Sequence, residues 1–135
     1  MEMDKDDPRT VLVVDDEPHV VAYLEMVLQD QGYTTVSAAN GREGIEKAKA
    51  HSPDLICLDI TMPEESGVRM YKNLKDDPDL GHIPVIVVTA KDLSEDDRRI
   101  LSGRVEQIVE KGACSHEHLL ELIRKVVPAE HRAAG

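Results

Sequence analysis

Aromatic residues are almost absent from this chain: its 135 residues include no Phe and no Trp, and only three Tyr. We therefore expect a core built from aliphatic side chains. A stacking platform for a nucleobase or a flavin ring is hard to assemble without aromatic rings. This scarcity argues against a flavin-binding protein.

Cysteine is also scarce, and long apolar runs are missing. Cys57 and Cys114 lie far apart in the sequence and show no metal-ligand spacing, so we expect reduced thiols in a cytoplasmic protein and no disulfide. No run approaches transmembrane length, and the acidic residues that follow Met1 do not resemble a signal peptide. These absences predict a cytoplasmic protein that does not bind membranes.

Basic residues are outnumbered, with 16 Lys and Arg against 27 Asp and Glu, for a net charge of −11. This balance argues against nucleic acid as a partner, because its phosphates attract basic surfaces. Part of the excess acid lies at the start of the chain, and we expect residues 1–8 to be disordered. The length suits one domain, which we place at residues 9–127, followed by a short tail at 128–135.

What the chain does contain is a regular alternation of two patterns. Apolar runs predict five strands, at residues 10–14, 33–38, 54–58, 85–88 and 105–109. Each run is followed by helical periodicity, beginning near Pro18, Asn40, Val68, Ser94 and Ser115. The strands are almost continuously apolar, which indicates burial on both faces. We therefore predict an α/β fold with a five-stranded, parallel, doubly wound sheet.

Reactive side chains follow the predicted strands at the points where they end. Asp15 and Asp16 follow the first strand, Asp59 the third, Thr89 the fourth and Lys111 the fifth. In an open parallel sheet these carboxyl ends form the edge where ligands bind. This set of groups suits a divalent cation and a phosphoryl group, because it combines three carboxylates with a hydroxyl and an ammonium.

Each of these residues also has an ordinary interpretation. Asp15 and Asp16 precede Glu17 and Pro18, so they suit a helix N-cap as well as a Mg²⁺ site, and the sequence leaves both open. Asp59 suits a turn after a strand, although a carboxylate is also a competent nucleophile toward phosphorus.

Thr89 and Lys111 likewise allow both an ordinary structural interpretation and a functional one. Thr89 suits a β-branched strand end, and its hydroxyl would equally donate to a phosphoryl oxygen. Lys111 taken alone is an ordinary surface lysine. Its place beside the acids favours a role in binding phosphate.

The combined pattern resembles the receiver domain of bacterial response regulators, from about Arg9 to Val127. The matching segments are residues 13–18 (VVDDEP), 58–63 (LDITMP) with Gly67, 83–90 (IPVIVVTA), and Lys111. The resemblance implies a flavodoxin-like (βα)5 fold with strand order 2-1-3-4-5.

The resemblance also implies roles for the site residues. Asp59 is the phosphoacceptor, and Asp16 and Asp59 bind Mg²⁺ directly. The backbone carbonyl of Thr61 also binds the metal, while Asp15 acts through water. The phosphoryl group is bound by Thr89 and Lys111.

The implied function is phosphorelay signalling. A histidine kinase or phosphotransfer protein donates the phosphoryl group, and the chain catalyses its own phosphorylation and dephosphorylation without independent metabolic activity. The sequence names neither the kinase nor the downstream protein target. By resemblance, the chain is a monomer or a weak dimer through the fourth helix, fifth strand and fifth helix, near residues 94–103, 105–109 and 115–127.

Two positions depart from the family's usual pattern. Gly112 follows Lys111 where receivers generally have a cis proline, and a cis bond without proline costs about 3 kcal/mol. Ile108 stands where receivers commonly carry a switching aromatic residue. The segment after Lys111 and residues 93–97 are similar to receivers within hybrid sensor kinases, so the chain suits a stand-alone regulator or an excised module.

Two alternatives carry other functions. A haloacid-dehalogenase-like phosphatase uses similar side chains, but it places an Asp-x-Asp nucleophile signature on the first strand, whereas here an acid pair comes first. A non-phosphorylated receiver-like scaffold would typically lack Asp59, Lys111 or a member of the acid pair, and all are present.

Overall fold

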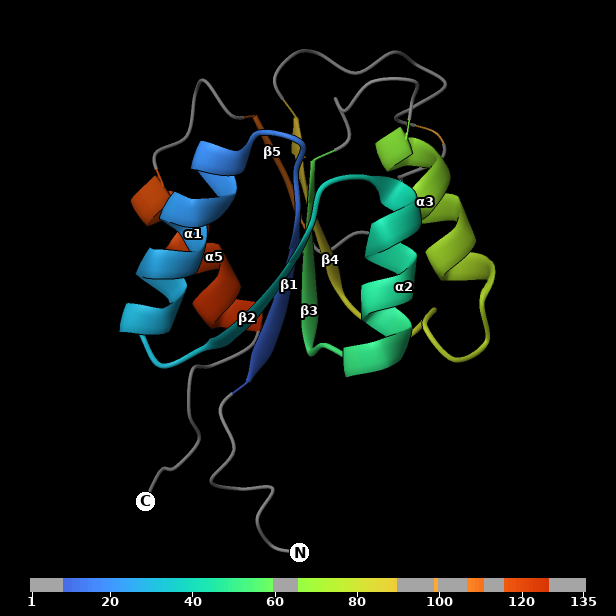
Figure 1. Ribbon diagram of the computed structural model, residues 1–135, viewed down its shortest axis with the longest axis horizontal. Helices are drawn as coiled ribbons and strands as arrows, with labels where there is room; N and C mark the ends of the chain where they lie inside the picture. The colour runs from blue at the N-terminus through green and yellow to red at the C-terminus, as the bar shows by residue number, and fades with distance from the viewer. Residues whose placement is uncertain (1–8, 60–65, 90–98, 100–106, 111–115, 127–135) are drawn as a thin grey trace, which may run out of the picture.

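A computed structural model describes residues 9–59, 66–89, 99, 107–110 and 116–126 of the chain (Figure 1). The elements are arranged as one parallel sheet between two layers of helices. Among the described residues, no helix has both the length and the apolar character needed to cross a membrane.

The sheet has five parallel strands in the order β2-β1-β3-β4-β5, which confirms the predicted fold class and strand order. The strands are β1 (Thr10–Val14), β2 (Thr34–Ala38), β3 (Leu55–Asp59), β4 (Val85–Thr89) and β5 (Gln107–Glu110). The third strand was expected to end before Asp59, whereas Asp59 is its last residue and pairs with Val88 of β4. The fifth strand extends one residue beyond the expected end at Val109.

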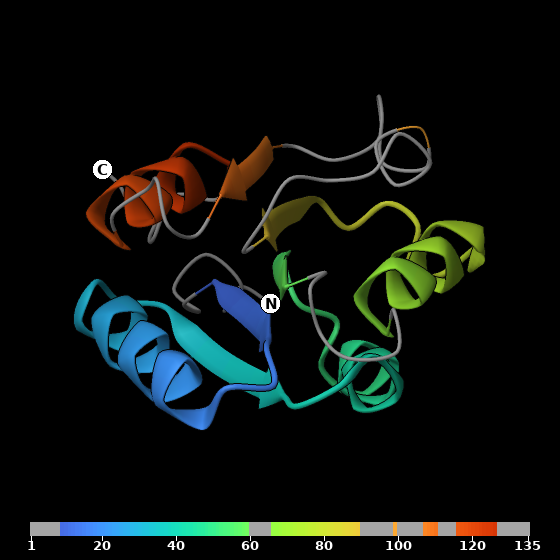
Figure 2. The same cartoon turned by 90° about the horizontal axis from the view of Figure 1, so that it is seen from above.

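Within the described part of the chain, two helices cover each face of the sheet. On one face lie α1 (Pro18–Asp30) and α5 (His116–Val126), and on the other lie α2 (Gly41–His51) and α3 (Ser66–Asp76) (Figures 1 and 2). The helix expected to begin at Ser94 falls outside the described residues, apart from Arg99.

The described residues form two core clusters, one on each face of the sheet, which are aliphatic apart from Tyr71 in one and Tyr33 and Cys57 in the other. Leu12 and Val14 of β1 belong to the cluster that contains Met70 of α3, while Val11 and Val13 belong to the cluster that contains Leu28 of α1. Alternate residues of a strand point to opposite faces, so the buried apolar residues Val11 to Val14 of β1 contribute to the core on both sides of the sheet.

The ends of the first two helices follow local sequence rules. Pro18 opens α1, and Gly32, with φ 100°, follows its C-cap residue Gln31. The N-cap of α1 is Glu17, so the interpretation of Asp15 or Asp16 as its cap is wrong. Asn40 caps α2 as expected, since its side chain accepts a hydrogen bond from the Glu43 amide at 2.8 Å.

Candidate functional site

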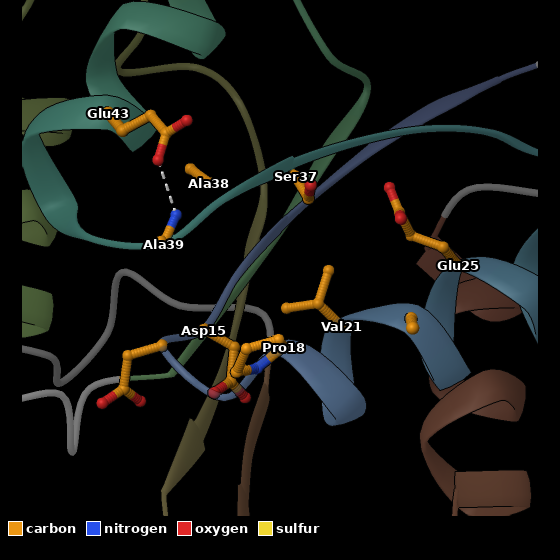
Figure 3. A pocket seen from close by; sticks show the side chains of 10 residues that line it. Asp15, Pro18, Val21, Glu25, Ser37, Ala38, Ala39 and Glu43 are labelled. Atoms are coloured by element: carbon orange, nitrogen blue, oxygen red, sulfur yellow. Dashed lines mark hydrogen bonds between the residues drawn. The ribbon is translucent and has the colours of Figure 1, made fainter.

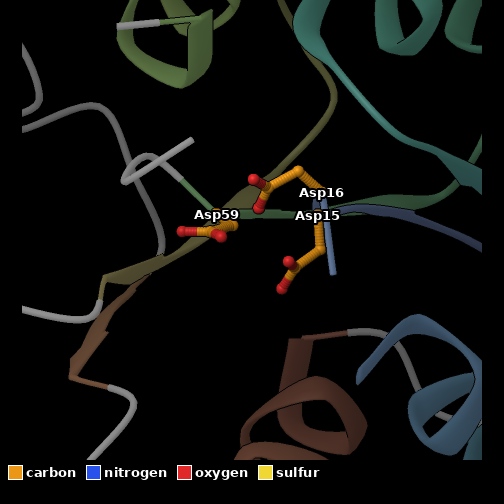
Figure 4. A group of neighbouring side chains, drawn as sticks. All are labelled: Asp15, Asp16 and Asp59. Carbon is orange, nitrogen blue, oxygen red and sulfur yellow. The ribbon is translucent and has the colours of Figure 1, made fainter. Parts of the chain in front are cut away.

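Three carboxylates gather at the carboxyl edge of the sheet. Asp15 and Asp16 follow β1 and Asp59 ends β3, and one oxygen from each lies within 4.8 Å of the others (Figure 4). Asp15 and Asp59 are buried, with 4% and 3% exposure, while Asp16 is exposed. The acids separated by more than forty residues in the sequence therefore form one cluster, which we call the carboxylate cluster.

The register of two neighbouring strands brings these acids together. Val14 of β1 pairs with Leu58 of β3, so the next residue of each strand, Asp15 and Asp59, reaches the edge at the same level. Asp15 is fixed further by its backbone, whose amide donates to the Ala38 carbonyl at 3.1 Å. The Glu17 amide donates to Asp15 Oδ1 at 3.0 Å, which orients that carboxylate.

The chemistry of this cluster is that of hard oxygen ligands. Neighbouring carboxylates repel one another, most strongly where burial reduces screening by water. A divalent cation such as Mg²⁺ would relieve that repulsion, because it accepts one or two protein carboxylates together with water and phosphate oxygens.

The remaining predicted site residues are placed only in part. Thr89 ends β4 at the same edge, one residue beyond Val88, which pairs with Asp59. Thr61 and Lys111 lie outside the described residues, as does the bond between Lys111 and Gly112.

A pocket of about 270 Å³ opens beside the carboxylate cluster, between α1 and the connection from β2 to α2 (Figure 3). The described residues that line it are Asp15, Asp16, Pro18, Val21, Ala22, Glu25, Ser37, Ala38, Ala39 and Glu43. Sequence reasoning missed this pocket, because these residues were assigned to a helix face, a strand end and a cap. Glu25, a charged residue within an apolar helical stripe, is the one local signal for it.

Comparison with known families matches residues 11–124 to the response regulator receiver domain. Among curated proteins, the chain is similar to the polar-differentiation response regulator DivK of Brucella anthropi, with 40% identity over 104 residues. The match covers 77% of this chain and 85% of DivK.

Solved structures agree with this match. The receiver domain of a signal transduction histidine kinase from Syntrophus aciditrophicus is 31% identical, with a TM-score of 0.78 and coverage of 94% of this chain and 96% of that one. The response regulator TrrA from Thermotoga maritima, solved in complex with Mg²⁺ and BeF, is 29% identical. Its TM-score is 0.74, with coverage of 88% of this chain and 99% of TrrA.

Proposed function

The chain belongs to the response regulator receiver domain family, and from this premise we propose that it accepts a phosphoryl group on Asp59. Receivers of this family act in two-component signalling. This membership argues against the alternative of a haloacid-dehalogenase-like phosphatase. The observation that carries the proposal is the position of Asp59. This residue is the last of β3, is 3% exposed, and lies in the carboxylate cluster with Asp15 and Asp16.

The carboxylate cluster fits Mg²⁺ by the chemistry of its donors, which are all hard oxygens close enough to share one cation. We assign Asp16 and Asp59 as direct ligands and Asp15 as a ligand through water, with the Thr61 carbonyl added by the family resemblance. When bound, Mg²⁺ supplies neutralisation of the negative charge on the phosphoryl oxygens.

The chain's own residues then carry the reaction. An Asp59 carboxylate oxygen attacks the phosphorus of a phosphohistidine, forming an acyl phosphate while the phosphorus–nitrogen bond breaks and its electron pair stays on the imidazole. The Thr89 hydroxyl and the Lys111 ammonium bind phosphoryl oxygens. The Glu17 amide donates to Asp15 Oδ1 and so orients that carboxylate before the reaction. Water later cleaves the acyl phosphate and restores Asp59.

Receiver domains work with kinases or phosphotransfer proteins, and we propose a histidine kinase or a phosphotransfer protein as the donor here. TrrA, a similar receiver, was solved with Mg²⁺ and BeF, which supports metal and phosphoryl binding at the corresponding site of this chain. We further propose a cytoplasmic monomer or weak dimer that does not bind nucleic acid. The buried Cys57, which forms no disulfide with any described residue, and the net charge of −11 support these assignments.

Incubation with acetyl phosphate and Mg²⁺ tests the phosphoacceptor. We expect intact-mass measurement to show one acid-labile phosphoryl group on the wild type, none on Asp59→Asn, and wild-type labelling on Asp76→Asn, which alters an exposed acid at the end of α3. Equal labelling of Asp59→Asn would refute the assignment. A wild type that accepts no phosphoryl group would instead support the non-phosphorylated scaffold.

A further inference from the structure

The pocket beside the carboxylate cluster contains polar groups that the described part of the chain leaves without partners. Glu25 is half-buried, and its carboxylate makes no hydrogen bond or ion pair with any described residue. The same holds for the half-buried Ser37 hydroxyl on β2. Figure 3 shows Glu25 reaching from α1 toward β2, where Ser37 lies. A half-buried carboxylate favours a cationic partner in the pocket.

The charge of the pocket lining points the same way. Of the described residues that line it, four are acidic, namely Asp15, Asp16, Glu25 and Glu43, and none is Lys, Arg or His. Glu43 is already used in part, because its Oε1 accepts a hydrogen bond from the Ala39 amide at 2.9 Å. Glu25 and Asp16 thus remain as the acids best placed to meet a positive charge.

The size and the apolar walls of the pocket define what kind of cation fits. About 270 Å³ falls just below the range of sites for drug-sized ligands. Pro18, Val21, Ala22 and Ala38 supply an apolar surface. Arginine and lysine side chains have this mixed character, since an apolar stem carries a charged end.

Neighbouring residues on α1 favour a protein over a free small cation. Met26 follows Ala22 by one helical turn and is 61% exposed, and Tyr23 is 41% exposed. These are the exposed large hydrophobic side chains of the described residues. Met and Tyr are enriched at protein interfaces. A protein that covers them can place a basic side chain in the adjoining pocket.

We propose that this pocket binds an arginine or lysine side chain of the partner protein that exchanges phosphoryl groups with Asp59. The inference rests on the proposed function, because the pocket shares Asp15 and Asp16 with the carboxylate cluster. A basic side chain seated there holds its protein at the phosphoacceptor edge of the sheet. Complementary charge of this kind increases the rate of encounter and selects among partners.

Titration with N-acetyl-arginine methylamide, followed by NMR at saturating Mg²⁺, tests the pocket. We expect saturable shifts of the Val21, Ala22, Ser37 and Ala39 amides. The uncharged citrulline analogue has nearly the same shape and should produce none. The proposal would be overturned by equal shifts with the citrulline analogue or by no shifts at all. It would also be overturned if Mg²⁺ eliminated binding, because the probe would then occupy the metal site.

Matched variants locate the charge that matters. Glu25→Gln should weaken arginine binding roughly two- to fivefold, the range expected for loss of a partly exposed ion pair. Glu46→Gln removes the same charge from an exposed position on α2 outside the pocket and should leave binding unchanged. Equal effects of both variants would show that net charge, and no specific pocket, attracts the probe.

Two further measurements separate the possible sources of failure. An arginyl-leucine amide should bind more tightly than the arginine probe, and Met26→Ser should remove this gain in affinity. If the affinity does not increase, the occupant of the pocket is a free cation and not a protein side chain. Acetyl phosphate labelling of Asp59 should be unchanged in Glu25→Gln. If the wild type binds the probe but accepts no phosphoryl group, the proposed function fails while the cation-binding pocket stands.

Discussion

Acidic side chains in this molecule have two different roles, and the groups that surround each side chain distinguish these roles. Asp54 accepts a hydrogen bond from the Thr10 amide at 2.9 Å and lies 3.8 Å from the Arg9 guanidinium. Asp15, Asp16 and Asp59 face other acids, with one oxygen of each within 4.8 Å of the others. Gathering like charges opposes folding, so their arrangement indicates selection for binding rather than for stability.

Tyr33 gives a prediction at the residue scale. Burial raises the pKa of its hydroxyl above the ordinary value of about 10, and the Arg124 guanidinium lowers that pKa by a smaller amount. The folded state therefore retains the proton at pH values where the unfolded chain has lost it. The resulting contribution to stability is complete below about pH 10 and is lost as the pH rises through the folded-state pKa.

Replacing Tyr33 with Phe should remove this dependence. We expect Tyr33→Phe to lose less unfolding free energy than the wild type between about pH 9 and pH 11, as measured by urea denaturation. Tyr23→Phe, which alters the exposed tyrosine of α1, should keep the wild-type slope. A Tyr33→Phe slope equal to that of the wild type would contradict the assigned cause.

The start of α2 links stability to the site at the scale of the element. The Asn40 side chain caps the Glu43 amide, and the Glu43 carboxylate accepts from the Ala39 amide. These two bonds fix the connection that forms one wall of the pocket beside the carboxylate cluster.

Removing the cap should therefore destabilise the domain measurably. We expect Asn40→Ala to lower the unfolding free energy by about 1 kcal/mol, while Asn40→Asp, which keeps an acceptor at the cap, should lose much less. Asn73→Ala removes an exposed asparagine within α3 and should be close to neutral or slightly stabilising. Equal losses in Asn40→Ala and Asn73→Ala would indicate that the cap contributes nothing. Denaturant titration measures all four proteins.

At the scale of the whole molecule, the net charge of −11 makes bound cations stabilising. The carboxylate cluster concentrates three of the negative charges in one place, two of them buried. A cation that binds the folded chain and not the unfolded one raises stability by mass action.

Magnesium should therefore raise the melting temperature beyond any effect of ionic strength. At about one hundred times its dissociation constant, the gain corresponds to about 2.7 kcal/mol. Sodium chloride at matched ionic strength serves as the control. Asp16→Ala should remain folded but lose both the Mg²⁺ response and Mg²⁺-dependent labelling, whereas Asp76→Ala, which alters an exposed acid outside the cluster, should keep both. Retention of both in Asp16→Ala would overturn the metal assignment.

The sequence determined the elements because their determinants are local. The apolar run from Val11 to Val14 specifies a strand buried on both faces, and Pro18, Gly32 and Asn40 set helix ends through their own backbone and side-chain chemistry. The motifs also predicted the strand order, through resemblance to a family. The strand and the helix ends depend on residues only a few positions apart, whereas the strand order came from motifs spread along the whole chain.

Tertiary structure decided what depends on distant segments. The pairing of Val14 with Leu58 brings Asp15 and Asp59 to one level. The helix α1 takes Glu17 as its N-cap, so neither Asp15 nor Asp16 caps it. The packing of α1 beside the β2–α2 connection sets Glu25 near Ser37 and creates the pocket. Such juxtapositions arise from the register and the layering of the sheet, which no single stretch of sequence contains.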